Sequence, residues 1–66
     1  MDKTEAKDAF LAQRPVVHQG ITYKKISALI YRIKSGAVSL SLELIDKNDN
    51  SVTIAAPEKV EIFRSN

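Results

Sequence analysis

The sequence predicts a mainly β domain in which a small barrel follows one N-terminal α-helix. The chain has 66 residues, of which 44% are hydrophobic and 27% charged, and this is the size and composition of a single globular domain over residues 1–66. From Val16 onward, short runs of β-branched and apolar residues are separated by turn-forming residues, whereas the residues before Pro15 are good helix formers. The order is therefore helix first and strands afterwards.

Residues 2–13 predict the helix. Alanine, leucine and glutamine favour a helix, and no glycine or proline interrupts the segment. Asp2 precedes Glu5 by three positions, which is the spacing of a capping box with aspartate as its first residue. Pro15 ends the helix because the residue before a proline is forced toward extended backbone.

The longest β segment, Ile21–Lys34, predicts one bent strand. Val16–His18 forms a short strand before it, and Gln19–Gly20 supplies the tight turn between the two. The apolar alternation in the long segment changes parity beside Lys24 and Lys25, where we expect a β-bulge. A strand that serves two faces in this way is typical of a small barrel built from two sheets.

Three further strands complete the predicted domain. They are expected over residues 38–44, 52–56 and 60–63. The first follows a Ser35–Gly36 turn, and its leucines and serines alternate cleanly. A single 3₁₀ turn is expected over residues 56–59. Five strands over residues 16–63, joined mainly by hairpins, fit an SH3-like barrel, because closure removes the exposed edges that so small a sheet cannot cover. The alternative is an open meander sheet with the helix across one face.

Several classes of protein are excluded by composition. The chain has no cysteine and one histidine, so we expect no zinc ribbon, no disulfide scaffold, no metal site and no cofactor. No stretch approaches the ~20 apolar residues that span a membrane. The polar N-terminus does not resemble a signal peptide, so a cytoplasmic protein with no membrane partner is expected.

Charge is distributed unevenly along the chain. The net charge is +2, but residues 9–42 contain no acidic residue and five basic ones. These basic residues are Arg14, Lys24, Lys25, Arg32 and Lys34. Two tyrosines lie in the same stretch. The sequence therefore predicts a non-enzymatic binding module whose basic face contacts nucleic acid or another polyanion. The predicted site residues are Lys24, Lys25, Arg32 and Lys34, with Tyr23 or Tyr31 stacking on a base.

The competing prediction is a protein-interaction or self-assembling module. A chain this short has a small core and no disulfide to stabilise it, and such scaffolds often depend on a partner or on self-association. Exposed strand edges or an apolar patch around Phe10 and Leu11 would form the contact. A homo-oligomer or a complex with another protein is expected in this case.

Groups with catalytic potential are few. His18 is the one side chain expected to titrate near neutrality, and beside a tight turn it is expected to be an exposed strand-end residue. No serine lies in a nucleophile-elbow sequence, so neither a catalytic site nor a small-molecule substrate is expected. Asp46, Asn48 and Asn50 have the spacing that opens a calcium loop, but Ser51 stands where that loop requires glycine. We therefore predict a hairpin turn there.

The order of these elements resembles that of SH3-like and Sm-like small barrels, including bacterial RNA chaperones of the Sm-like type. The resemblance lies in the N-terminal helix, the turn at Gln19–Gly20, the long bent strand and the proline-bearing turn at residues 56–60. It implies a barrel fold, and no binding residue carries over, because Ala56–Val60 replaces the RNA-binding residues of that family. The stretch from Pro15 to Val60 also resembles short proteins of Gram-positive mobile elements, a likeness that implies no activity.

Overall fold

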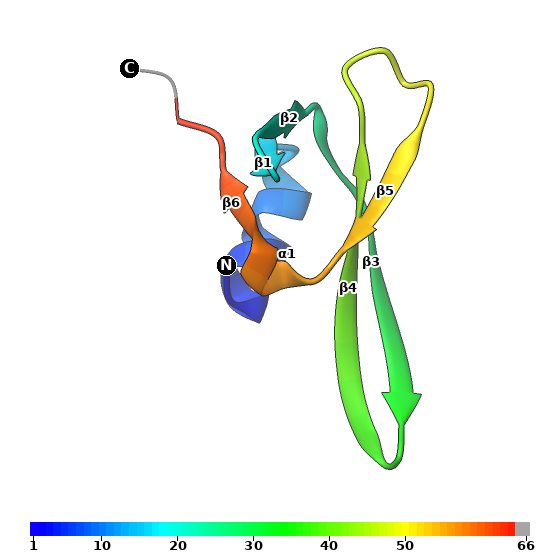
Figure 1. Cartoon of the computed structure of the whole chain (residues 1–66). Helices are drawn as coiled ribbons and strands as arrows, with labels where there is room; N and C mark the ends of the chain where they lie inside the picture. The colour runs from blue at the N-terminus through cyan, green and yellow to red at the C-terminus, as the bar shows by residue number, and fades with distance from the viewer. Residues whose placement is uncertain (65–66) are drawn as a thin grey trace.

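A computed structural model describes residues 1–64 of the chain as one α-helix and six β-strands (Figure 1). In chain order the elements are α1 (Lys3–Ala12), β1 (Val16–His18), β2 (Ile21–Tyr23), β3 (Lys25–Lys34), β4 (Ala37–Ile45), β5 (Val52–Ala55), the 3₁₀ helix η1 (Pro57–Lys59) and β6 (Val60–Ile62). The prediction of a mainly β chain with an N-terminal helix is confirmed.

The strands form two antiparallel sheets of three strands each. Their orders are β2-β1-β6 and β3-β4-β5, and within residues 1–64 no backbone ladder joins one sheet to the other. The prediction of five strands closed into an SH3-like barrel is therefore wrong in strand number and in closure. β1, β2 and β6 have only three residues each, which is too short to follow the ten-residue β3 around a barrel.

The sixth strand arises because the predicted long strand breaks at Lys24. β2 ends before this residue in one sheet, and β3 begins after it in the other. The backbone N–H of Lys24 donates to the carbonyl of Ile45 at 2.9 Å, so Lys24 already contacts the second sheet. The β-bulge lies slightly later than predicted, because the register shifts between Ile26 and Ala28. Sharing of this segment between two sheets is confirmed.

The helix begins and ends where its capping residues predict. The carboxylate of Asp2 accepts a hydrogen bond from the backbone N–H of Glu5 at 2.7 Å, and Gln13 ends the helix in the left-handed conformation. Ala6 and Ala9 are buried and lie on the side of α1 that packs against the rest of the molecule. Small side chains at these two positions let the helix approach β3 closely.

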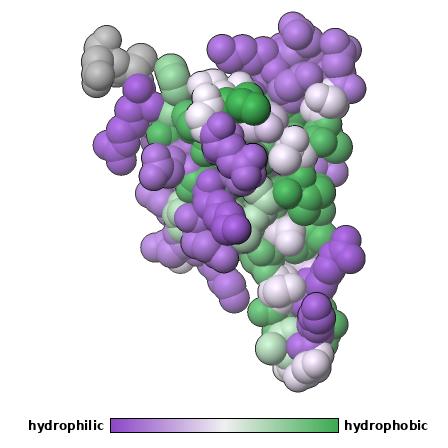
Figure 2. Space-filling view, in the orientation of Figure 1, coloured by the Kyte–Doolittle hydropathy of each residue, from purple (hydrophilic) through white to green (hydrophobic). Residues whose placement is uncertain are grey.

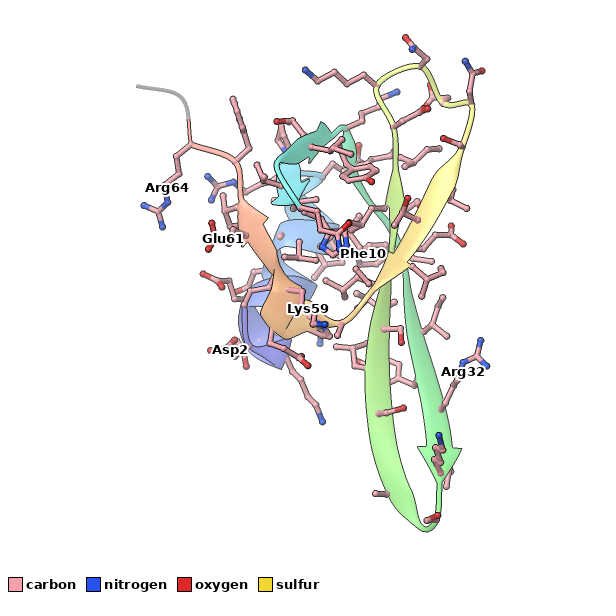
Figure 3. The ribbon with its side chains drawn as sticks, in the orientation of Figure 1. Asp2, Phe10, Arg32, Lys59, Glu61 and Arg64 are labelled. Atoms are coloured by element: carbon pink, nitrogen blue, oxygen red, sulfur yellow. The ribbon has the colours of Figure 1, made fainter. Side chains whose placement is uncertain are left out.

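The core lies between the helix and the two sheets. Its largest fully buried side chains come from both sheets and are Val16, Ile26, Leu42, Leu44 and Val60. Phe10, on α1, is half-buried against this cluster and points toward the sheets (Figure 3). The one helix among the described residues is not long and apolar enough to cross a membrane.

The β3–β4 hairpin projects beyond the rest of the molecule. Its far end extends past α1 and past the other strands, and β5 accompanies β4 only from Leu42 to Ile45 (Figure 1). The molecule is accordingly elongated, with extents of 40 × 25 × 21 Å.

Candidate interaction surface

The two faces of the projecting hairpin are defined by its register. Directly opposed residues share a face, and the pairs Leu29–Leu42, Tyr31–Leu40 and Ile33–Val38 form the inner face, which continues the core. The pairs between them form the outer face, namely Ile30–Ser41, Arg32–Ser39 and Lys34–Ala37. Alternation with period two thus separates the basic side chains from the apolar inner ones.

The inner face changes from buried to exposed along the hairpin. Leu42 is fully buried and Leu40 is 7% exposed, but Val38, two residues nearer the tip of the hairpin, is 54% exposed. On β3, Tyr31 is 58% and Ile33 is 80% exposed. We call these three side chains, Tyr31, Ile33 and Val38, the overhang. It is a continuation of the hydrophobic core beyond the elements that cover the core.

The outer face of the same sheet is also rich in apolar side chains. Val52 and Ile54 of β5 are 51% and 52% exposed, and they pair with Ile45 and Glu43 of β4. Ile45 and Ile30 are half-buried. Figure 2 shows hydrophobic side chains along this sheet and down the hairpin, while hydrophilic ones gather over the loop of residues 46–50. Strands that read as nearly continuous apolar runs are typical of sheets covered on both faces.

Two of the six predicted polyanion-binding residues are engaged elsewhere. Tyr23 is buried, 8% exposed, and its hydroxyl donates a hydrogen bond to Oγ1 of Thr53 at 3.2 Å. The ammonium of Lys24 pairs with the carboxylate of Asp49 at 3.0 Å. Burial leaves no ring face of Tyr23 for a base, and the carboxylate offsets the charge of Lys24.

The other four predicted residues are divided between the two faces of the hairpin. Lys25, Arg32 and Lys34 belong to the outer face, and Arg32 extends from β3 away from α1 (Figure 3). Tyr31 belongs to the inner face. Arg32 and Lys34 are two residues apart, but Lys25 lies roughly 20 Å from Arg32 at the usual rise per strand residue. The structure therefore brings together only Arg32 and Lys34 on one surface, without an aromatic ring beside them.

Sequence reasoning missed the overhang. It placed the apolar contact patch around Phe10 and Leu11, of which Leu11 is 65% exposed while Phe10 packs on the core. The signal was present in the segment Ala28–Ile33, where apolar residues occupy both parities instead of one. Such a run indicates a strand with two apolar faces.

His18 lies inside the molecule, contrary to the prediction of an exposed strand end. It is 7% exposed, and its Nδ1 lies 2.9 Å from the carbonyl oxygen of Lys59. The pairing of His18 with Val60 across β1 and β6 places the ring under η1. Within residues 1–64, no three histidine, aspartate or glutamate side chains are grouped so as to hold a metal ion.

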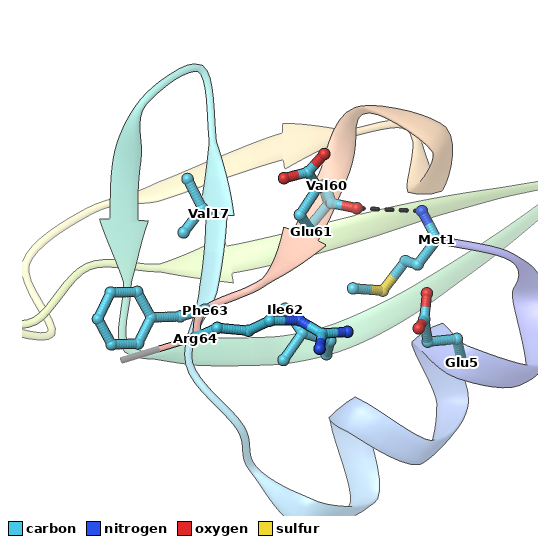
Figure 4. A pocket seen from close by; sticks show the side chains of 8 residues that line it. All are labelled: Met1, Glu5, Val17, Val60, Glu61, Ile62, Phe63 and Arg64. Atoms are coloured by element: carbon cyan, nitrogen blue, oxygen red, sulfur yellow. Dashed lines mark hydrogen bonds between the residues drawn. The ribbon is translucent and has the colours of Figure 1, made fainter. Parts of the chain in front are cut away.

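A cleft of about 600 Å³ lies between the start of α1 and β6 (Figure 4). The N-terminal ammonium of Met1 lies at one side of the cleft. It donates hydrogen bonds to the carbonyl oxygens of Pro57 and Val60, at 2.8 and 3.0 Å. The charged side chains that line the cleft are Glu5, Glu61 and Arg64. Neither a hydroxyl nor an imidazole accompanies them, so the described lining has no nucleophile paired with a base.

The loop of residues 46–50 forms a hairpin turn organised by Asp46. Its carboxylate accepts hydrogen bonds from the backbone N–H groups of Asn48 and Asn50, at 3.1 and 2.8 Å, and from the hydroxyl of Ser51 at 3.0 Å. The bond from Asn50 is the main cause of a lowered pKa at Asp46. These contacts occupy the carboxylate within its own turn, so the predicted turn is confirmed.

Comparison of the chain with protein-family models, with curated proteins and with solved structures finds no match.

Proposed function

We propose that this chain is a non-enzymatic protein-interaction module whose binding surface is the β3-β4-β5 sheet. The observation that carries the proposal is that both faces of this sheet present apolar side chains to solvent. The overhang exposes Tyr31, Ile33 and Val38 on one face, and β5 exposes Val52 and Ile54 on the other. Contiguous apolar patches of a few hundred Å² mark interaction sites in small proteins.

The energetic reason is the cost of leaving such side chains in water. Burying a large aliphatic side chain stabilises a complex by roughly 1.5–3 kcal/mol. Isolated exposed apolar residues are ordinary, but Tyr31, Ile33 and Val38 are neighbours on one face, and a projecting hairpin offers them to a partner without steric obstruction. A protein surface with its own apolar side chains is the kind of partner that covers them.

The test uses the whole chain and two matched substitutions, Ile33→Asp on the inner face and Ile54→Asp on the outer face. We expect the wild-type chain to bind a protein saturably, whether a second copy or a different chain, and the complex to be reconstituted from purified components. At least one substitution is expected to weaken that binding tenfold or more, because a carboxylate would be buried without a partner. The proposal fails if neither self-association nor any reconstituted complex responds to either substitution.

A second candidate function is binding of nucleic acid or another polyanion by Arg32 and Lys34 on the outer face of the hairpin. The placement of Arg32 and Lys34 side by side on the outer face favours it, and among the described residues neither forms an ion pair. Two neighbouring cations neutralise few phosphates, so we expect weak binding with a shallow salt dependence.

Filter binding to single- and double-stranded nucleic acid at two salt concentrations tests this candidate. The double substitution Arg32→Ala with Lys34→Ala is expected to abolish binding, whereas Lys24→Ala, which removes a cation already paired with Asp49, is the control and is expected to change it little. No binding by the wild-type chain at low salt would eliminate the candidate and leave the protein-interaction proposal unaffected.

A further inference from the structure

We infer that the occupant of the overhang is a second copy of this chain, with two hairpins packed inner face to inner face about a two-fold axis. The inference rests on the proposed function and names its partner. In this arrangement the hairpins run antiparallel, so that the Ile33–Val38 pair of one copy lies over the Tyr31–Leu40 pair of the other. The contact is isologous, since the same patch serves both copies.

Charge favours self-packing of the inner face of the hairpin over self-packing of its outer face. All inner-face side chains from Leu29 to Leu42 are uncharged, and the alternation of the strands sends Arg32 and Lys34 outward. When two inner faces meet, the basic residues of both copies lie on the outside of the sandwich, in water. Two outer faces brought together would instead oppose the same cations across the contact, which is destabilising.

The molecule has a hollow into which the β3–β4 turn of the second copy could pack. A hollow of about 600 Å³ lies where the hairpin leaves the body, and its lining includes Leu40, Ser41 and Pro57. The hairpin turn carries the small residues Ser35, Gly36 and Ala37. In the antiparallel arrangement the turn extends two residues beyond the Ile33–Val38 pair, so it lies past the partner's Leu40, at the edge of this hollow.

The charged groups of the hollow balance one another. Asp2 and Glu58 are negative, and Lys3 and the N-terminal ammonium of Met1 are positive. The hollow therefore receives the turn through its shape and its apolar lining, with no net charge to attract or repel Lys34.

The area of the overhang sets the expected strength of the dimer. From the exposed fractions of its three side chains, it presents roughly 350 Å² per copy, in the range of functional apolar patches. Two copies of the overhang together present about 700 Å², and even with the hollow the contact stays below the ~1,200 Å² of stable specific interfaces, in the size class of transient contacts. A weak, reversible dimer that grows with concentration is therefore expected.

Sedimentation velocity over a wide concentration series tests the inference on the whole chain. The wild-type mass should rise from 7.3 kDa toward twice that value as concentration increases. Ile33→Asp should hold the chain at the monomer mass, while Ile54→Asp, the same change at another exposed isoleucine on the opposite face, should leave the dimer intact. Circular dichroism of each variant verifies that the fold is retained, which we expect because both side chains are more than half exposed.

Thiol cross-linking provides a second readout that does not depend on charge. The chain has no cysteine, so a single introduced thiol is cross-linked only between chains. In the proposed dimer Ile33 lies over Tyr31 of the other copy, so the two residue-33 positions are too far apart for a direct disulfide, and the probe is a short bifunctional maleimide. It should join Ile33→Cys chains at least tenfold faster than Ile54→Cys chains.

Three outcomes overturn the inference. They are a monomer at every wild-type concentration, a dimer lost only in Ile54→Asp, and equal cross-linking rates for the two cysteine variants. A monomer that nevertheless forms a reconstituted complex with a different protein, sensitive to Ile33→Asp, would refute the second copy as occupant while upholding the interaction module. If the wild-type chain forms neither a dimer nor a complex with another protein, the proposed function itself is refuted.

Discussion

The hydroxyl of Tyr23 in β2 donates a hydrogen bond to Oγ1 of Thr53 in β5, at 3.2 Å. Because β2 and β5 belong to different sheets, this contact joins side chains across the two halves of the molecule. Tyr23 is 8% exposed, so its ring is part of the core while its hydroxyl reaches the rim. A tyrosine that the sequence suggested for stacking on a base thus has a structural role.

Removal of this hydrogen bond is predicted to have a modest cost. Tyr23→Phe should lower the free energy of unfolding by about 0.5–1.5 kcal/mol, since the ring stays packed and only the hydroxyl is lost. Thr53→Val should have a similar effect. The double variant should cost less than the two single effects added together, because neither polar group is then left without its partner. Urea denaturation of the four proteins gives the coupling energy, and strict additivity would contradict the bond.

The buried alanines of α1 are predicted to tolerate no larger side chain. Ala6 is 0% exposed, so Ala6→Leu should destabilise the protein by about 1–3 kcal/mol through overpacking against the sheets. The matched control is Ala12→Leu, the same substitution at an exposed position of the same helix, which should change stability by no more than about 0.5 kcal/mol. Thermal unfolding of both variants measures the difference. Equal effects would mean that α1 does not dock through Ala6.

The turn at the tip of the hairpin is predicted to require Gly36. Its φ is +79° and that of Ser35 is +52°, so both residues adopt the left-handed backbone of a type I′ turn. Gly36→Ala should cost about 1 kcal/mol, because a Cβ disfavours this conformation. Ser35→Asn should instead raise stability slightly, since asparagine tolerates the left-handed region better than serine does. Opposite signs in chemical denaturation are the expected result, and a neutral Gly36→Ala would contradict the turn geometry.

Low pH is predicted to lower the stability of the folded protein through protonation of Asp46. The hydrogen bonds from Asn50, Ser51 and Asn48 favour the ionised carboxylate, so its pKa lies below the ordinary value of 3.8. A carboxyl group whose pKa is lowered by folding contributes stability that is fully present above its unfolded pKa and is lost as the pH falls through its folded pKa. The stability difference between wild type and Asp46→Asn should therefore be greatest near neutral pH and shrink below pH 3.8.

The control for this pH dependence is Asp49→Asn in the same loop. Asp49 makes an exposed ion pair with Lys24, and such pairs contribute little. Asparagine also keeps the tolerance for positive φ that this position, at +58°, requires. Chemical denaturation across the pH range should show a smaller effect for Asp49→Asn than for Asp46→Asn. A pH-independent difference at Asp46 would contradict the proposed cause.

Local chemistry made most of the elements predictable. Asp2 and Pro15 bound the helix through their own side chains, and the turns at Gly20 and Gly36 follow from backbone freedom at those glycines. The regular alternation from Val38 to Leu44 predicted β4, and the change of parity near Lys24 predicted a strand shared by two sheets. Each of these features depends on interactions between residues close in the chain.

The candidate site was less accessible to such reasoning. The acid-free stretch of the sequence led to the prediction of a site at Lys24, Lys25, Arg32 and Lys34. The local residue pattern does not show that Lys24 pairs with Asp49. Nor does it show that Tyr23 is buried with its hydroxyl bonded to Thr53. Both contacts join residues 25 or more positions apart in the chain. Strand alternation puts Tyr31 and Arg32 on opposite faces, and the prediction of one basic face with Tyr31 stacking on a base did not take this into account.

By itself, the sequence determined where the chain turns, which side chains share a strand face and that the first half of the domain is basic. Only the tertiary structure decided that the sheets stay separate and that Leu40 is covered while Val38, two residues away on the same face, is not. The physical reason is that the alternation of apolar residues along a strand defines which side chains share a face. Whether that face is buried depends on other elements, distant in the chain, that pack against it. Here α1 and η1 end before the hairpin does, and the apolar face continues past them into water.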